Sequence, residues 1–277
     1  MLKTVLVVLD ESSYSETATT LALEWGRRFG ARLLGLGILD KPSIIAVEPV
    51  PLGASSFKRE RDEARLAEAQ RRVKRFLSKF RKRCSTARIP ATIFEDVGDP
   101  TKCILKHAHR CDLIVLGRET NFHFETQHES DDVQAKVLRR SPRPIVVVPR
   151  ELPVGSGVVV AYGGGREVGR TLQTFQLLGL AHGETIHLVA VSRDDQKTEV
   201  SAELAAEFLE SHGERYKLHV VESALAPADV LLDQVRSLRP PLLVMGAHAH
   251  HPLHDLFVTS VTRAVLRACP VPVLIGA

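Results

Sequence analysis

The sequence repeats itself, and this internal repeat limits the folds open to the chain more than any other feature. An apolar run that ends in glycine, Asp112-Leu-Ile-Val-Leu-Gly117, returns as Pro241-Leu-Leu-Val-Met-Gly246. Farther along, Val137-Leu-Arg-Arg-Ser-Pro-Arg-Pro144 returns as Val265-Leu-Arg-Ala-Cys-Pro-Val-Pro272, and an apolar run follows each copy. Each unit is typical of a buried strand that leads into a glycine turn and a helix with an X-Pro exit. The repeat therefore predicts two tandem modules.

Strand and helix patterns alternate through both modules. This alternation predicts in each domain a parallel, five-stranded, doubly wound sheet with helices on both faces, a Rossmann-like nucleotide-binding α/β fold. The ligand of such a fold lies in the crevice at the carboxyl ends of the strands. The predicted strands are 4–9, 32–39, 91–95, 113–116 and 144–148, then 157–162, 185–191, 217–221, 242–245 and 272–275. The predicted helices are 15–29, 57–83, 100–110 and 131–140, then 167–179, 199–212, 226–238 and 258–267.

The boundary between the modules falls in Pro149-Arg-Glu-Leu-Pro-Val-Gly-Ser156, a segment poorly suited to a helix or a central strand. We place the domains at 1–149 and 157–277, with 150–156 as the linker. The closing strands, 144–148 and 272–275, are predicted edge strands, and exposed edges are commonly protected by pairing. We therefore expect a pseudo-two-fold arrangement in which these strands meet.

Length and composition favour a folded protein of the cytoplasm. The chain has 277 residues, of which 44% are hydrophobic, enough for two cores of ordinary domain size. No apolar stretch approaches the roughly 20 residues of a membrane helix, and the N-terminus lacks the apolar core of a signal peptide. The 4 cysteines show no paired spacing, as expected for reduced thiols.

One predicted helix holds the basic excess. Residues 58–83 carry 12 Lys or Arg and 4 Asp or Glu, a net charge of +8, so the rest of the chain carries −4 within a total of +4. Aromatic residues for base stacking are absent from the polar face, and nucleic-acid binding is not expected. The apolar stripe that should face the core is Ala69, Val73, Phe76, Leu77 and Phe80.

A long, partly apolar loop, residues 41–56, distinguishes the first module from the second. Loops of this length inside a compact domain are often functional. We expect the loop either to cover the first-module crevice or dock a partner, or to pack onto the basic helix. Its apolar residues include Ile44, Ile45, Val47 and Val50.

The motif positions resemble the universal stress protein family in its tandem, two-domain form, over nearly the whole chain. The resemblance rests on Asp10-x-Ser12 after the first strand, on the strand-terminal Gly117 and Gly246, and on the closing Pro-x-Pro strands. It implies that an aspartate in the first strand-to-helix turn meets the nucleoside. It also implies that a later turn, Gly-x2-Gly-x9-Gly-Ser/Thr, wraps the phosphates of ATP in members that bind it, and that the closing strands meet at a dimer interface.

The second module keeps most of a phosphate-binding turn. Glycines let backbone amides approach phosphate oxygens, and hydroxyls at a helix N-terminus add donors. Ala249 and Thr259 stand where the family has its second and third glycines, and Gly163 replaces the aspartate. We expect partial capacity for ATP or another adenine nucleotide, chiefly in the second domain. The residues expected at the nucleotide are Asp10, Ser12, Gly163, Val191, Met245, Gly246, His248, Thr259, Ser260, Val261 and Thr262.

The first module keeps the nucleoside end of the site but lacks the phosphate-binding end. It keeps Asp10 and Ser12, but Asp131 and Asp132 occupy the places of Thr259 and Ser260. Carboxylates at a helix N-terminus repel phosphate, so a triphosphate is not expected there. An N-cap of the first helix is the alternative role for Asp10.

Two other functions stay open at this point. A nucleotide-hydrolysing enzyme would need an activating base, and a metal-binding protein would need a ligand cluster. Walker and Gly-x-Ser-x-Gly motifs are absent, so we expect a non-enzymatic stress-response sensing or interaction module, with no metal and no membrane. Its expected assemblies are pairing of the two domains within the chain and, beyond that, a homodimer. The candidates for the alternatives are the turn with His248, His250, His251, His254 and Asp255, and the helical series Cys103, His107 and Cys111.

Overall fold

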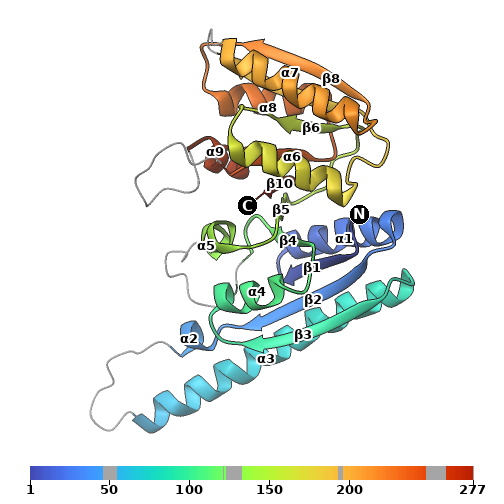
Figure 1. Ribbon diagram of the computed structural model, residues 1–277. Helices are drawn as coiled ribbons and strands as arrows, with labels where there is room; N and C mark the ends of the chain where they lie inside the picture. Colours follow the sequence, from blue (N-terminus) through green and yellow to red (C-terminus); the bar gives the residue numbers. More distant parts are fainter. Residues whose placement is uncertain (46–54, 121, 123–132, 193–195, 248–259, 277) are drawn as a thin grey trace.

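The part of the chain that the structure describes contains ten strands and the helices that join them, arranged in two similar halves (Figure 1). The computed structural model describes residues 1–45, 55–120, 122, 133–192, 196–247 and 260–276. The first half contains β1 (Thr4–Leu9), α1 (Ser13–Phe29), β2 (Arg32–Leu39), α2 (Lys41–Ile44), α3 (Ser55–Thr86), β3 (Ala91–Val97), α4 (Pro100–Ala108), β4 (Leu113–Gly117), α5 (Val133–Arg140) and β5 (Ile145–Val148).

The second half repeats this order without a counterpart of α2 among its described residues. It contains β6 (Val158–Ala161), α6 (Arg166–Leu178), β7 (Ile186–Ser192), α7 (Gln196–Ser211), β8 (Tyr216–Glu222), α8 (Pro227–Leu238), β9 (Leu243–Gly246), α9 (Ser260–Ala268) and β10 (Val273–Gly276). The predicted strands are confirmed with shifts of one or two residues at their ends. Residues 131–132 and 258–259, predicted to begin two of the helices, lie outside the described residues.

All ten strands form one continuous sheet, in the order β3-β2-β1-β4-β5-β10-β9-β6-β7-β8. Neighbours within each half are parallel, whereas β5 and β10 pair antiparallel, with Val147 opposite Val273 and Ile145 opposite Ile275. The predicted meeting of the closing strands is therefore confirmed. The strand order reads the same from either end, as a pseudo-two-fold axis through the β5–β10 junction requires.

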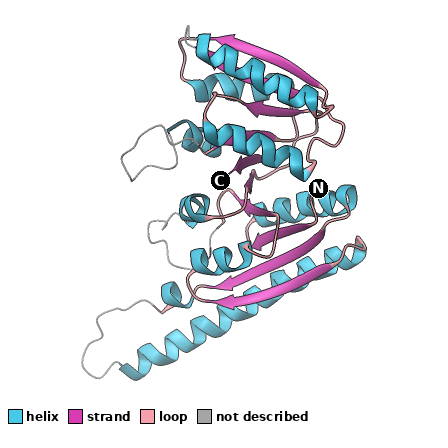
Figure 2. Ribbon diagram, viewed as in Figure 1, coloured by secondary structure: helices cyan, strands magenta, loops and turns pink. Residues whose placement is uncertain are grey.

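Helices cover both faces of the sheet (Figure 2). Side chains on a strand point alternately to the two faces, so Val5 and Val7 join one buried cluster and Leu6 and Val8 join the other. The first cluster packs against α1, α3, α6 and α7, which define the first face. The second cluster packs against α4, α5, α8 and α9, which define the second face.

Glycines in β2 allow α3 to lie close to the sheet. A Cβ atom on Gly35 would come within 2.6 Å of the Phe80 ring, and one on Gly37 within 2.9 Å of Val73 and Leu77. The predicted apolar stripe is confirmed, because Ala69, Val73, Leu77 and Phe80 are buried and Phe76 is partly buried against the same cluster. The basic residues consequently lie on the outer side of α3.

Helices occupy both ends of segment 41–56, which the sequence predicts to be a loop throughout. Asp40 caps α2 by accepting a hydrogen bond from the Ser43 backbone N–H, and α3 already begins at Ser55. Ile44 packs against the first-face cluster, and α2 contacts α3, as the packing alternative for this segment requires. Val47 and Val50 lie outside the described residues.

The two halves also touch beyond the sheet. The Leu2 backbone N–H donates to the Leu178 carbonyl at 2.8 Å, and Arg28 forms an ion pair with Glu184 at 3.4 Å. Arg118, which follows β4, donates to the carbonyls of Arg267 and Cys269 at the end of α9. Cations suit the negative end of a helix dipole, so this contact joins the first half to the last helix of the second. No helix in the described part of the chain has the length and apolar character to cross a membrane.

Candidate functional site

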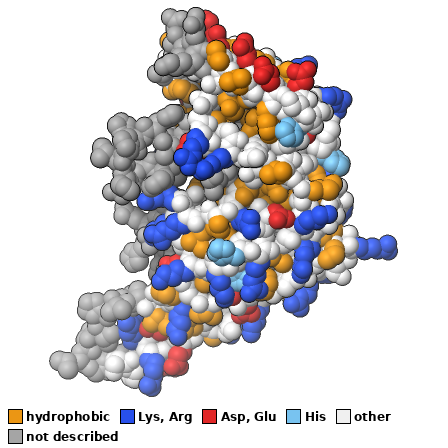
Figure 3. Space-filling view, viewed as in Figure 1, with side chains coloured by type: hydrophobic (Ala, Val, Ile, Leu, Met, Phe, Trp, Pro, Cys, Tyr) orange, Lys and Arg blue, Asp and Glu red, His pale blue; other side chains and the backbone are white. Residues whose placement is uncertain are grey.

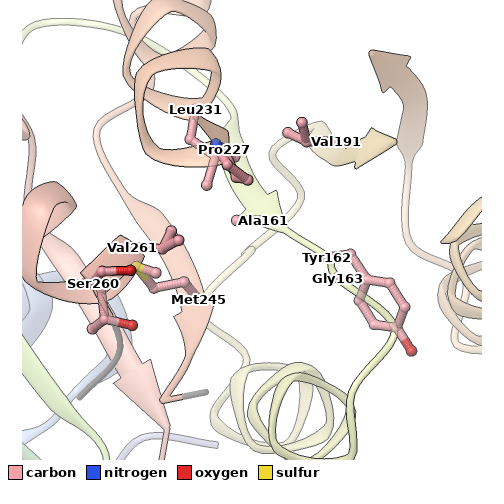
Figure 4. A pocket seen from close by; sticks show the side chains of 10 residues that line it. Ala161, Tyr162, Gly163, Val191, Pro227, Leu231, Met245, Ser260 and Val261 are labelled. Carbon is pink, nitrogen blue, oxygen red and sulfur yellow. The ribbon is translucent and has the colours of Figure 1, made fainter. Parts of the chain in front are cut away.

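A cavity of about 370 Å³ lies in the second half at the carboxyl ends of its strands. β6 and β9 are neighbours in the sheet there. β7 lies on the far side of β6, and β10 lies on the far side of β9. The chain order reverses between β6 and β9, and ligands of open α/β sheets bind at such a switch point. Its lining residues are Ala161, Tyr162, Gly163, Val191, Pro227, Leu231, Met245, Ser260, Val261 and Thr262 (Figure 4).

The parallel pairing of the strands places these residues together. Ala161 ends β6 beside Met245 of β9, and Val191 lies near the end of β7. α8 begins with Pro227, a residue favoured in the first turn because it needs no N–H partner there, and Leu231 follows one turn later. α9 begins with Ser260. The cavity therefore lies between three strand ends and the N-termini of two helices.

The cavity combines an apolar wall with hydroxyl groups at one end. Val191, Leu231 and Met245 supply the wall, and Ser260 is exposed at the first residue of α9 (Figure 4). Thr262 also lines the cavity but is only 1% exposed. A few convergent polar groups in a mainly apolar pocket are typical of sites for small organic ligands. The N-terminus of α9 adds a positive dipole end suited to an anion.

Gly246, expected at the nucleotide, is needed for helix packing. A Cβ atom at this position would lie 2.7 Å from the backbone nitrogen of Val168 and 2.8 Å from its Cα atom. Gly117, its counterpart in the first half, has a similar neighbour, because a Cβ atom there would lie 2.6 Å from Cβ of Tyr14. In both halves the first helix therefore crosses the end of the fourth strand at a distance that only glycine permits.

The turn after the first strand differs between the halves. In the first half Ser12 is the N-cap of α1, and its hydroxyl accepts from the Ser15 backbone N–H. In the second half Gly165 is the N-cap of α6 and supplies no side-chain hydrogen bond. The N-cap alternative for Asp10 is thus wrong, since Ser12 holds that position.

Asp10 instead organises the turn from inside. It is 4% exposed, and its Oδ1 atom accepts hydrogen bonds from the Ser12 backbone N–H at 2.9 Å, the Ser12 hydroxyl at 2.5 Å and the Ser15 hydroxyl at 2.6 Å. Three donors on one carboxylate oxygen fix the position of the Asp10 side chain. Gly163, at the matching place in the second half, cannot form such a network.

Larger side chains stand at two of the corresponding positions in the first half. The strand registers match Ala161 with Val8 and Val191 with Ile38, so these two cavity-lining residues have bulkier counterparts. Phe122 is 2% exposed and joins the second-face cluster that contains Val8 and Ile38. The sequence gives no sign that Phe122 is buried, because this residue follows Gly117 in a stretch where the family motif is missing.

Cys103, His107 and Cys111 do not form a metal site. α4 ends at Ala108, so Cys111 lies beyond the helix on which the sequence placed all three. Burial raises the pKa of Cys103 to about 11 and that of Cys111 to about 12, which keeps both thiols neutral. His107 instead contacts Asp96 at 3.1 Å and lies against the Phe94 ring. Within the described ranges no three His, Cys, Asp or Glu side chains gather as metal ligands do.

The burial of His107 predicts a loss of stability in mild acid. Burial lowers the pKa of His107, and the Asp96 carboxylate offsets only part of that shift. The unfolded chain therefore binds more protons than the folded chain once the pH falls below the ordinary histidine pKa of about 6.5, and stability decreases from there downward. Chemical denaturation between about pH 7.5 and 5 checks this. His107→Gln should flatten the decline, and an unchanged slope would contradict the assignment.

The structure brings six of the expected nucleotide residues together around the cavity: Gly163, Val191, Met245, Ser260, Val261 and Thr262. Gly246 ends the adjoining strand, whereas Asp10 and Ser12 belong to the first half. His248, Thr259 and the remaining residues of the histidine turn lie outside the described residues. Sequence reasoning missed Ala161, Tyr162, Pro227 and Leu231. The proline that opens α8, matched by Pro100 at the start of α4, was the available signal for two of them.

Comparison with known proteins identifies the class of protein that this fold and cavity define. The model of the universal stress protein family matches residues 1–149 and again residues 157–275. The chain therefore belongs to the universal stress protein family and carries two copies of its domain.

Individual relatives match over nearly the full length. A universal stress protein of Synechocystis is 24% identical over 289 residues, which cover 99% of each chain. The crystal structure of a universal stress protein from Archaeoglobus fulgidus aligns with 99% of this chain and 95% of its own, at 18% identity and a TM-score of 0.70. A functionally unknown protein from Pseudomonas aeruginosa aligns with 99% of this chain and 92% of its own, at 17% identity and a TM-score of 0.64. At these identities the solved structures establish the shared fold.

Proposed function

We propose that this protein is a non-enzymatic stress-response sensing or interaction module that binds an adenine nucleotide, such as ATP, in its second half. The observation that carries the proposal is the cavity at the β6–β9 switch point, whose apolar wall ends at the hydroxyl-bearing start of α9. Its volume of about 370 Å³ lies within the range of small-ligand pockets. In this proposal residues 1–149 and 157–277 are the two domains and 150–156 the linker.

The residues fit the two ends of a nucleotide. Val191, Leu231 and Met245 form the apolar surface for the base, and Ser260 with the first backbone amides of α9 faces the phosphates. Gly163 stands where an aspartate would contact the nucleoside. Because that contact is missing, we expect weak binding.

The first half is proposed not to bind a triphosphate. Asp10, its best candidate ligand, already accepts three hydrogen bonds on one oxygen atom. In this proposal Val8, Ile38 and the buried Phe122 fill the space that Ala161 and Val191 leave open in the second half. A nucleotide there would have to displace buried apolar side chains, which costs free energy.

The absence of catalysis is proposed from the chemistry of the cavity. Among its described lining residues Tyr162 alone has an ionisable side chain, and the phenol ring points away from Leu231 and Val261 (Figure 4). Tyr162 packs partly against the first-face cluster, and burial raises the pKa of its hydroxyl. A general base is therefore not at hand within the described part of the cavity.

Replacing Ser260 with aspartate tests the proposed site. A carboxylate in the first turn of α9 suits the helix dipole but repels phosphate, so folding should persist while ATP affinity falls at least about tenfold, or about 1.4 kcal/mol. Isothermal titration calorimetry measures the affinity. Ser13→Asp, at the exposed first residue of α1, is the matched control and should leave ATP binding unchanged. Loss of binding in Ser13→Asp but not in Ser260→Asp would place the site in the other half.

A further inference from the structure

α3 and α7 occupy the same place in the two halves but carry opposite charge. Each follows the second strand of its half and covers the first face, α3 over β2 and β3, and α7 over β7 and β8. α3 has a net charge of +8 from 12 basic and 4 acidic residues. α7 has a net charge of −3 from Lys197 and four glutamates, Glu199, Glu203, Glu207 and Glu210. The two helices are therefore electrostatic complements.

Part of the charge on α3 is used inside the first half. Glu11 pairs with Arg72 at 2.6 Å and Arg75 at 2.8 Å, and Glu16 pairs with Lys79 at 2.7 Å and Arg83 at 3.1 Å. These pairs join α3 to α1 and its preceding turn. Other cations, Arg71, Lys74, Arg81 and Lys82, are also exposed, and of these Arg71 pairs with Glu68 of the same helix at 2.6 Å. They give α3 an outward basic surface that the contact with α1 does not account for.

α7 presents apolar side chains among its glutamates. Val200 is 54% exposed and Leu204 is 59% exposed, and Glu203, Glu207 and Glu210 are exposed beside them. Acidic and apolar side chains alternate over α7 at the upper end of the molecule, and Lys and Arg are frequent toward the other end (Figure 3). Apolar side chains together on one exposed helix face often mark an interaction surface.

The outward stripes of the two helices match in register. On α3 the exposed Ala64 and Ala67 are followed two turns later by Arg71 and Lys74. On α7 Val200 and Leu204 are followed by Glu207 and Glu210. Side by side and parallel, the helices would place small apolar residues against large ones and basic residues against acidic ones, since neighbours on a helix face recur every three to four residues.

We propose that α3 of one molecule docks against α7 of a second copy of this chain. The two helices lie at opposite ends of the ten-stranded sheet, so they cannot meet within one molecule (Figure 1). In a second copy of the chain, α7 offers the surface that complements α3, and the two surfaces are always present at the same concentration. Each contact leaves one α3 and one α7 available, so the association is head-to-tail and either closes into a ring or continues. This inference is independent of nucleotide binding.

Sedimentation velocity over a concentration series tests whether the full-length protein self-associates. At low ionic strength the mean mass should rise with concentration. In about 1 M salt, where charges are screened beyond about 3 Å, the protein should sediment as a monomer. If the protein sediments as a monomer at every concentration in low salt, the proposal is wrong, even if α3 binds an acidic peptide.

Charge reversal identifies the surfaces. Arg71→Glu with Lys74→Glu makes α3 acidic at the proposed contact, and Glu207→Lys with Glu210→Lys makes α7 basic. Each reversed protein alone should associate at least about tenfold more weakly than the unaltered protein. An equimolar mixture of the two should recover association, because each then offers a surface that the other complements. Failure of the mixture to associate, or association unchanged in both reversed proteins, would contradict the α3–α7 contact.

The apolar part of the contact has its own control. Val200→Ser with Leu204→Ser should weaken association, whereas Leu177→Ser, at a side chain 66% exposed on α6, should not. Circular dichroism and thermal unfolding establish that each variant is folded. Equal weakening by Leu177→Ser would assign the association to another surface.

Discussion

Replacing Phe122 with alanine is expected to lower the free energy of unfolding by about 3–5 kcal/mol, because truncating a buried phenylalanine leaves a cavity as well as losing apolar burial. Phe122 is 2% exposed within the second-face cluster. The same cluster contains Val8 and Ile38, whose counterparts in the second half, Ala161 and Val191, border the cavity. The size of the effect therefore measures how firmly the first-half crevice is filled.

Chemical denaturation of Phe122→Ala and of Phe57→Ala measures this effect. Phe57 is 74% exposed near the start of α3, so its loss should change stability by less than about 0.5 kcal/mol. If Phe122→Ala were as mild as Phe57→Ala, the first half would not be filled as described. An increase in ATP binding by folded Phe122→Ala would further show that the ring is what excludes the nucleotide.

Replacing Gly246 with alanine is expected to cost about 1–3 kcal/mol of stability, because the added methyl group meets the backbone of α6. The contacts of 2.7 and 2.8 Å to Val168 leave no space for it. Gly117→Ala should have a similar effect in the first half. The two changes test whether the repeated glycines serve the packing of the first helix on the sheet.

Gly169→Ala is the matched control for this pair. Gly169 lies inside α6 with no atom within 4 Å of an added Cβ, so alanine should be neutral or stabilise the protein by about 0.5–1 kcal/mol. A neutral Gly246→Ala that nevertheless abolished ATP binding would assign the glycine to phosphate contact instead.

The strands could be predicted closely because their own residues determine them. Within β1, residues 5–9 are all apolar and buried, so a local pattern suffices. The β5–β10 pairing was also predictable, since repeated closing strands present two equivalent edges. The packing alternative for the segment at Ile44 was visible from its apolar residues, but its short helix is capped by hydrogen bonds from Ser43 to Asp40.

The site was less predictable because it depends on side chains from distant segments. Pro227 and Leu231 reach the cavity only through the placement of α8 beside β6 and β7. Asp10 matched a family motif in sequence, but its hydrogen bonds to Ser12 and Ser15 arise from the geometry of the turn. Motif position alone could not distinguish a ligand-binding aspartate from one that holds its own turn.

The central claim is that one chain holds one nucleotide site, in the second half. Hydrogen–deuterium exchange with and without ATP tests it most directly, because bound ligand slows exchange of the backbone amides around it. We expect slower exchange in residues 161–163, 227–231 and 260–266, with no change in residues 8–15 and 100–104, their first-half counterparts. Protection confined to the first-half segments, or no protection in either half at saturating ATP, would contradict the claim.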